Sequence, residues 1–147
     1  MRWPKHTLVM CTAAMLSLPT FFAQAHGDKR GVDSETLLES ERSWDGTRYS
    51  AYPQGTPQLS VLKITIAPNS SLDWHQHPIP NAAYVQSGVV TIEKKSSGEK
   101  RQVTAGEVLP EVVDIAHRGY TTQEGAVLIV FYAGKKGVPL SVPAGER

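Results

Sequence analysis

The sequence from residue 34 onward is broken into short apolar or alternating segments, and each ends within a few residues at glycine, proline, asparagine or serine. Alternation of apolar and polar residues has the period of a half-buried strand, and no stretch keeps the roughly 3.6-residue period of a long helix. Residues 36–43 do not distinguish a short helix from an early strand. The pattern predicts an all-β chain with strands over residues 59–66, 72–77, 82–86, 89–94, 100–104, 108–109, 115–121 and 126–132.

Three histidines bear on the choice between the two architectures that such strands allow, a β-sandwich and a jelly-roll barrel. His75 and His77 are separated by one residue, so on a strand their side chains point to the same side. His117 lies on a later predicted strand. The interior of a barrel is where these three side chains can meet, and the histidines therefore favour the barrel.

Strand parity then predicts which neighbours share the barrel interior with the histidines. On the predicted strands around Asn81 and His117, residues two positions apart belong to one face. The expected inward set is Asn81, Ala83, Val85, Ile115, Gly119 and Thr121, with Tyr84 and Gln86 on the other face.

Residues 1–25 have the layout of a secretory signal peptide. Arg2 and Lys5 precede an apolar stretch, which ends at Ala23-Gln24-Ala25. A membrane-spanning helix would need about 20 apolar residues, and polar residues and Pro19 interrupt this stretch. We therefore expect cleavage after residue 25, and a periplasmic or secreted protein with no stable membrane anchor.

The rest of the sequence has the length of one compact domain. Residues 26–33 are polar and contain glycine, which predicts a flexible lead; the barrel is expected over residues 34–140, followed by a C-terminal tail over residues 141–147. The chain has 15 Lys and Arg against 14 Asp and Glu, a balance that indicates no nucleic-acid partner. Its one cysteine, Cys11, lies in the leader, so no cysteine-based metal site is expected.

Three neutral imidazoles that converge can hold a divalent transition metal. The alternative is a pair of surface histidines at residues 75 and 77, beside Pro78, and a hydrogen-bonded core histidine at 117. Imidazole binds several ions of this class with affinities set mainly by the metal, so Zn, Fe, Mn, Ni and Cu all remain candidates.

The spacing around the first two histidines resembles the first motif of the cupin superfamily. In this sequence it runs His75-x-His77, three residues, Asn81, six residues, Gly88. The resemblance implies a cupin-like double-stranded β-helix, which is a jelly-roll barrel.

Gly106, followed eleven residues later by His117, resembles the second cupin motif. The two motifs extend the resemblance over residues 59–132. More closely, the chain resembles the small exported single-domain cupins that carry a Ser-Trp-Asp-Gly segment ahead of the barrel, here Ser43-Trp44-Asp45-Gly46. The resemblance implies metal binding by His75, His77 and His117.

The sequence departs from the cupin pattern at four places: Asn81 stands at the usual glutamate, Asn69 at the glycine that opens the first motif, and Thr121 at a common asparagine. The fourth is the Pro-x-Gly expected before His117, where this chain has Val112-Val113-Asp114. An amide oxygen is a weak ligand for such an ion, so Asn81 is interpreted as a hydrogen-bonding neighbour of the ligands, together with Asp114 and Thr121. Three neutral imidazoles would leave a divalent ion its full double charge. Such a site should attract anionic ligands and acidify bound water.

Other polar and aromatic residues leave alternatives open. Glu111 and Asp114 are candidates for a general base or for a residue that orients His117, or they are solvated turn carboxylates. Aromatic residues near the expected barrel mouth are interpreted as packing residues, with a stacking wall for a ligand as the alternative. They are Trp44, Tyr49, Tyr52 and Trp74.

The last predicted strand is apolar on both faces over residues 127–132, which predicts that other parts of the protein cover both of these faces. The cover could come from the N-terminal segment or from a second subunit, and we predict a homodimer.

Two functions fit these observations. The first is a metalloenzyme that acts on a small molecule by oxygen-dependent, hydrolytic or isomerising chemistry. The second is a non-catalytic module of the periplasm that binds a ligand or a metal.

Overall fold

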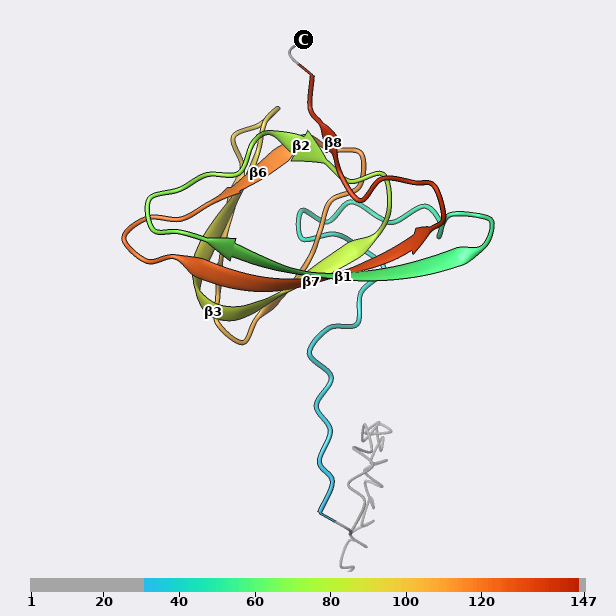
Figure 1. The fold of residues 1–147 in the computed structure, drawn as a ribbon, viewed down its shortest axis with the longest axis horizontal. Coiled ribbons are helices and arrows are strands. Elements are labelled where there is room, and N and C mark those ends of the chain that lie inside the picture. Colours follow the sequence, from blue (N-terminus) through green and yellow to red (C-terminus); the bar gives the residue numbers. More distant parts are fainter. Residues whose placement is uncertain (1–30, 146–147) are drawn as a thin grey trace, which may run out of the picture. The chain divides into compact units, whose positions relative to one another are not determined.

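The computed structural model describes residues 31–145, and the named elements of this part of the chain are all strands (Figure 1). No helix in residues 31–145 is long and apolar enough to span a membrane. The strands are β1 (Pro57–Ile66), β2 (His75–Gln76), β3 (Asn81–Lys94), β4 (Lys100–Thr104), β5 (Val108–Pro110), β6 (His117–Tyr120), β7 (Ala126–Lys135) and β8 (Val142–Pro143).

The named strands pair antiparallel and form two sheets that share β3. The first half of β3 pairs with β5 and with β7, and β7 in turn pairs with β1. The second half of β3 pairs with β4 and with β6, and the order continues through β2 to β8. This curled arrangement is the expected jelly-roll architecture (Figure 1).

One continuous strand, β3, passes from one sheet to the other where the sequence predicts two strands joined by a turn at Ser87-Gly88. The prediction of a turn was wrong because these residues form a bend inside the strand. The register shifts between Val85 and Ser87, and Gly88 has a φ of 76°. A Cβ at residue 88 would overlap the carbonyl oxygen of Gly125, so only glycine fits this bend.

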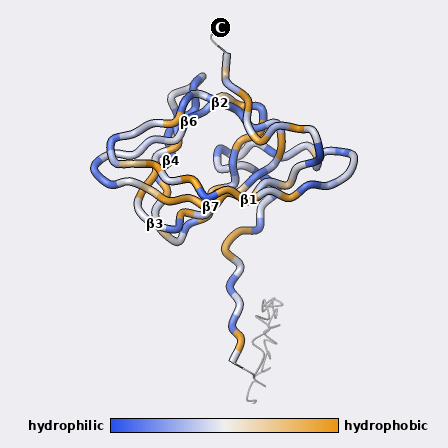
Figure 2. Tube along the Cα trace, viewed as in Figure 1, coloured by the Kyte–Doolittle hydropathy of each residue, from blue (hydrophilic) through white to orange (hydrophobic). Residues whose placement is uncertain are grey.

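The core lies between the sheets and follows the predicted parity. Asn81, Ala83 and Val85 of β3 are buried, whereas Gln86 is exposed. Gly119 and Thr121 are buried on the same side as His117. Hydrophobic residues are concentrated along β7 and the adjacent parts of β1 and β3 (Figure 2).

The strands that carry the histidines are shorter than predicted: the segment 72–77 contains only β2, and the segment 115–121 contains only β6. Asp114, with a φ of 56°, breaks the extended backbone just before β6. The segment 36–43 contains neither a helix nor a named strand.

The sequence set residues 141–147 apart as a tail, but they contain β8, which pairs with β2. Pro143 stands opposite His75, and Val142 stands opposite Gln76. This end of the chain therefore belongs to the sheet that carries the histidines, because its backbone completes the edge of β2.

Candidate metal centre

The structure brings the three predicted ligands together. His75 and His117 stand directly opposite each other in the β2–β6 pair, and His77 follows β2 immediately. One nitrogen from each ring lies within 4.8 Å of the other two. His77 and His117 are buried, and His75 is half-buried. Metal–nitrogen bonds are about 2.1 Å, so side-chain movements of less than about 1 Å bring all three onto one ion.

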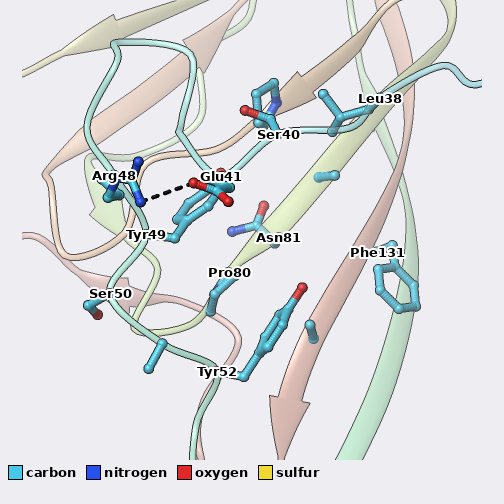
Figure 3. Close-up of a pocket in the computed structure, with 14 residues that line it drawn as sticks. Leu38, Ser40, Glu41, Arg48, Tyr49, Ser50, Tyr52, Pro80, Asn81 and Phe131 are labelled. Carbon is cyan, nitrogen blue, oxygen red and sulfur yellow. Dashed lines mark ion pairs between the residues drawn. The ribbon is translucent and has the colours of Figure 1, made fainter. Parts of the chain in front are cut away.

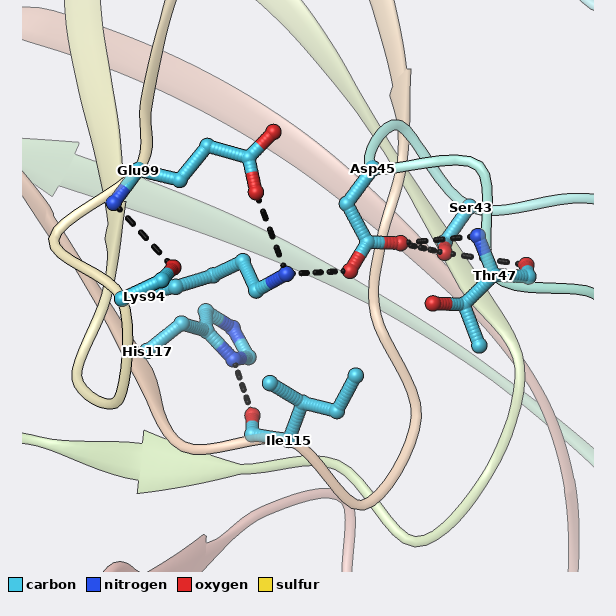
Figure 4. Close-up of polar contacts among 8 residues, drawn as sticks. Ser43, Asp45, Thr47, Lys94, Glu99, Ile115 and His117 are labelled. Carbon is cyan, nitrogen blue, oxygen red and sulfur yellow. Dashed lines mark hydrogen bonds and ion pairs between the residues drawn. The ribbon is translucent and has the colours of Figure 1, made fainter.

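Backbone carbonyl oxygens determine which ring nitrogen of each histidine is free. The Nδ1 atoms of His75, His77 and His117 each lie 2.8 Å from a carbonyl oxygen. A carbonyl oxygen only accepts hydrogen bonds, so each Nδ1 carries the hydrogen and the neutral ring presents the lone pair of its Nε2. The accepting carbonyls belong to Asp73, Leu140 and Ile115, and the last of these contacts is drawn in Figure 4.

A carboxylate that the sequence left open joins this cluster. Glu111, immediately after β5, is only 6% exposed. Its Oε2 lies 3.1 Å from Nε2 of His117 and 4.0 Å from Nε2 of His77. The backbone amide of Glu111 donates to the carbonyl oxygen of Asn81, because the chain after β5 runs beside the start of β3. Glu111 is therefore a member of the site, and not a solvated turn residue.

The protonation of the cluster follows from burial and from this carboxylate. Burial lowers the pKa values of His75 and His77. Burial also acts to lower the pKa of His117, but the neighbouring Glu111 carboxylate outweighs it and raises that pKa. Burial alone would raise the pKa of Glu111, yet its contact with His117 and the charges of the other histidines lower it. Glu111 is thus the anionic member of the cluster.

The donor set fits a divalent transition metal. Imidazole nitrogens and a carboxylate oxygen are the ligands that such ions take in proteins. Nε2 of His117, Oε2 of Glu111 and Oδ1 of Asn81 are buried without a hydrogen-bond partner in the described part of the chain. Buried polar atoms are normally paired, and a cation among them would satisfy the lone pairs of the first two.

The three residues expected to support the ligands contact other groups. Asn81 is buried, and its Nδ2 donates to the carbonyl oxygen of Ile79 at 3.4 Å. Asp114 is exposed, and its backbone amide donates to the carbonyl oxygen of His77. Thr121 donates to the carbonyl oxygen of Ala67 at 2.6 Å, so it fastens the loop after β1.

Tyr132 is a residue near the site that the sequence reasoning missed. It is 3% exposed, and its ring centroid lies 5.5 Å from that of His77. Burial and the charge of Glu111 raise its pKa to about 12, so its hydroxyl keeps its proton. Alternation along β7 was the available signal, since Leu128, Val130 and Tyr132 share the buried face.

The Ser-Trp-Asp-Gly segment and the residues after it are hydrogen-bonded to the barrel next to Glu111. The amide of Trp44 donates to the carbonyl oxygen of Pro110 at 2.8 Å, and the hydroxyl of Tyr49 donates to the carbonyl oxygen of Glu111 at 2.7 Å. Asp45 forms an ion pair with Lys94 at 2.7 Å and accepts a hydrogen bond from Ser43 (Figure 4). Trp44 also packs against the hydrophobic core, which agrees with a packing role, whereas Tyr49 lines a pocket together with Tyr52.

The other two aromatic residues differ in their surroundings. The guanidinium of Arg118 lies 4.5 Å from the ring centroid of Trp74, which gives Trp74 a packing role. Tyr52 is 72% exposed and borders a pocket of about 360 Å³. This pocket lies between residues 38–52 and the outer side of β3 and β7. Pro80, Phe131 and the Glu41–Arg48 ion pair also line it (Figure 3). None of the three histidines lines it.

No protein-family model matches the chain, and no curated protein matches it. Solved structures do match. A cupin-like protein of Thermotoga maritima has a TM-score of 0.51 at 15% identity, over 60% of this chain and 65% of that one. The polyketide cyclase RemF of Streptomyces resistomycificus has a TM-score of 0.53 at 17% identity, over 63% of this chain and 64% of that one.

A third structure, the DMSP lyase DddQ of Ruegeria pomeroyi, has a TM-score of 0.52 at 16% identity, over 69% of this chain and 49% of that one. The chain thus spans between about half and two thirds of the length of these proteins. At identities this low, the similarity shows the fold but not the activity. The jelly-roll barrel, the converging histidines of the two motifs and these structural neighbours together identify the chain as a protein of the cupin fold.

Proposed function

We propose that this protein is a metal-dependent enzyme that acts on a small molecule. The observation that carries the proposal is the set of three histidines whose Nδ1 atoms all contact carbonyl oxygens, which leaves each Nε2 free in a group whose candidate ligand nitrogens lie within 4.8 Å of one another. A lyase and a cyclase named for small-molecule substrates are among the proteins with a similar fold, which supports the class of chemistry.

The residues of the barrel would perform distinct tasks in such a reaction. His75, His77 and His117 hold the ion, which when bound supplies Lewis-acid activation of a substrate or water oxygen. Glu111 brings a negative charge to the centre, and the buried ring of Tyr132, whose hydroxyl stays protonated, packs against His77. The half-buried His75 marks the side from which a small molecule reaches the centre.

Metal analysis of the protein purified from its native compartment tests the proposal. We expect one equivalent of a transition metal, lost in His117→Ala, together with turnover in a panel that measures oxygen uptake, hydrolysis and isomerisation. Bound iron would indicate oxygen chemistry, and bound zinc would indicate hydrolysis or isomerisation. A fully metallated protein without turnover would instead support the non-catalytic binding module. A protein without metal would contradict the metal-dependent enzyme and leave a module that binds a ligand.

We propose that the protein works in the periplasm or is secreted, on the strength of the leader pattern in residues 1–25, which lie outside the described residues. N-terminal sequencing of the protein recovered from fractionated cells should begin at His26. A cytoplasmic protein that keeps its leader would contradict this.

We also propose a homodimer that forms through the outer face of β1 and β7. Leu59, Val61 and Phe131 are 68%, 62% and 41% exposed on this sheet, and Val61 stands directly opposite Phe131. Exposed apolar side chains that adjoin one another are typical of a surface that a partner covers.

A further inference from the structure

Neither the cupin motifs nor the grouping of histidines assigns a role to Glu111. We propose that Glu111 is a fourth protein ligand of the metal, supplied from the segment that runs beside β3. This inference rests on the proposed metal site and goes further by naming a carboxylate ligand outside the histidine motifs.

The contacts of the carboxylate point to a shared ion. Oε2 of Glu111 is 3.1 Å from Nε2 of His117 and 4.0 Å from Nε2 of His77, so one oxygen faces two nitrogens. Both nitrogens are on the ring side opposite the Nδ1 atoms that bond to carbonyl oxygens. When the rings are neutral, three lone pairs therefore converge. A metal ion satisfies such a convergence, because each atom supplies an electron pair.

The burial of the Glu111 carboxylate also indicates a bound cation. Glu111 is 6% exposed, and the only groups of the described chain within ion-pair distance of it are His77 and His117. No lysine or arginine in residues 31–145 is recorded as pairing with it. A buried carboxylate requires a compensating cation and hydrogen bonds. A single proton on His117 would compensate one contact only, whereas a divalent ion compensates the oxygen and both nitrogens.

The backbone around Glu111 is held as a ligand position requires. Its amide donates to the carbonyl oxygen of Asn81 at 3.1 Å, and its carbonyl oxygen accepts from the hydroxyl of Tyr49 at 2.7 Å. The preceding carbonyl oxygen, of Pro110, accepts from the amide of Trp44. These three bonds come from two different parts of the chain, so the backbone at Glu111 is held in place before any ion binds.

Position 81 and Glu111 are thus neighbours through the first of these bonds. The carboxylate that the motif lacks at Asn81 is supplied across this contact from the next strand. The centre then carries one negative charge from the protein, so the expectation of a doubly charged site is revised. Such a centre should favour neutral or singly anionic oxygen ligands over multiply charged ones.

The test compares metal binding in Glu111→Gln with that in the wild-type protein. Glutamine keeps the size and removes the charge. The protein is freed of metal with a chelator, Zn²⁺ affinity is measured by competition with a coloured chelator, and the absorption spectrum of the Co²⁺-loaded protein reports the ligand set. Glu124→Gln, which changes an exposed carboxylate, is the matched control, and His117→Ala tests the histidine site itself.

We expect Glu111→Gln to bind Zn²⁺ at least tenfold more weakly and to change the Co²⁺ spectrum, while Glu124→Gln matches the wild-type protein. Wild-type affinity and an unchanged spectrum in Glu111→Gln would overturn the fourth ligand and leave the histidine site intact. A wild-type protein that binds no metal would instead overturn the proposed function.

If Glu111→Gln does not fold, the wild-type protein still decides the question. Infrared difference spectra with and without Zn²⁺ should show a shift of a buried carboxylate stretching band, and Glu124→Gln should show the same shift. Absence of any carboxylate shift on stoichiometric metal binding would overturn the proposal.

Discussion

Among single residues, two positions that are far apart in sequence determine the charge of the candidate metal centre. Asn81 interrupts the expected motif with a neutral amide, and Glu111 brings a carboxylate to the same part of the barrel. The histidines could be predicted because their spacing encodes a shared strand face. The role of Glu111 could not, because the sequence around it has no pattern that distinguishes a buried carboxylate from a solvated one.

Gly88 carries a prediction at this scale. Gly88→Ala would place a methyl group against the carbonyl oxygen of Gly125 and require a φ of 76° from alanine. We expect a loss of about 3 kcal/mol in the free energy of unfolding, measured by urea titration. Gly98→Ala is the matched control, since Gly98 has a φ of 68° and no atom within 4 Å of the added Cβ. The control should lose only about 1 kcal/mol. Equal losses would contradict the close contact as the cause.

The Asp45–Lys94 pair predicts a pH dependence of stability. Burial would raise the pKa of Asp45, but hydrogen bonds from Lys94, Ser43 and Thr47 outweigh it and hold the pKa well below its usual range. A carboxyl whose pKa is lower in the folded state stabilises the fold above its unfolded pKa of about 4. That stabilisation is lost progressively as the pH falls below this value.

We therefore expect Asp45→Asn to lower the free energy of unfolding by about 1–3 kcal/mol at pH 7, with the difference from the wild-type protein shrinking in acid. Urea titrations at a series of pH values measure it. Glu124→Gln, at an exposed position, should follow the wild-type curve. A difference between Asp45→Asn and wild type that does not change with pH would argue against the ion pair.

Among the elements of the fold, the segment of residues 38–52 is hydrogen-bonded to the backbone beside the candidate metal centre. Trp44 and Tyr49 bond to consecutive carbonyl oxygens, those of Pro110 and Glu111. The alternation of apolar and polar residues predicted β1, β4 and β7 well, because alternation and turn residues are local signals. The same signals missed the bend at residue 88, where a glycine that usually marks a turn lies within a strand.

Tyr49→Phe tests this connection. It removes the hydroxyl that donates to the carbonyl oxygen of Glu111, so we expect a loss of about 1 kcal/mol in the free energy of unfolding. Metal affinity should fall severalfold, because the carboxylate is held less firmly. Tyr52→Phe is the matched control, since Tyr52 is 72% exposed. If both variants bind metal as the wild-type protein does, the segment has no part in positioning Glu111.

At the scale of the whole molecule, the two sheets bury one face each and leave the outer side of β1 and β7 apolar and open. Lys63 is the one charged side chain of β1, and Leu59, Val61 and Phe131 adjoin it. Strand β7 is apolar on both faces; its inner face is buried in the barrel core, and its outer face is only partly covered.

Light scattering at micromolar concentration measures the proposed dimer. We expect the wild-type protein to have the mass of a dimer and Val61→Glu to be monomeric, because a charge at 61 would be buried without a partner. Gln123→Glu, in an exposed loop, should remain dimeric. A monomeric wild-type protein would contradict the prediction.

The all-β class and the shared face of His75 and His77 could be predicted from the sequence alone, because they depend on alternation between residues a few positions apart. What surrounds the candidate ligands depends on the tertiary structure. The carbonyl oxygens of Asp73, Ile115 and Leu140 orient the rings, and Glu111 reaches the site because β5 pairs with β3. Every residue has a carbonyl oxygen, so the sequence does not indicate which one will contact a histidine. Strand pairing joins residues far apart in sequence, so local patterns do not predict it either.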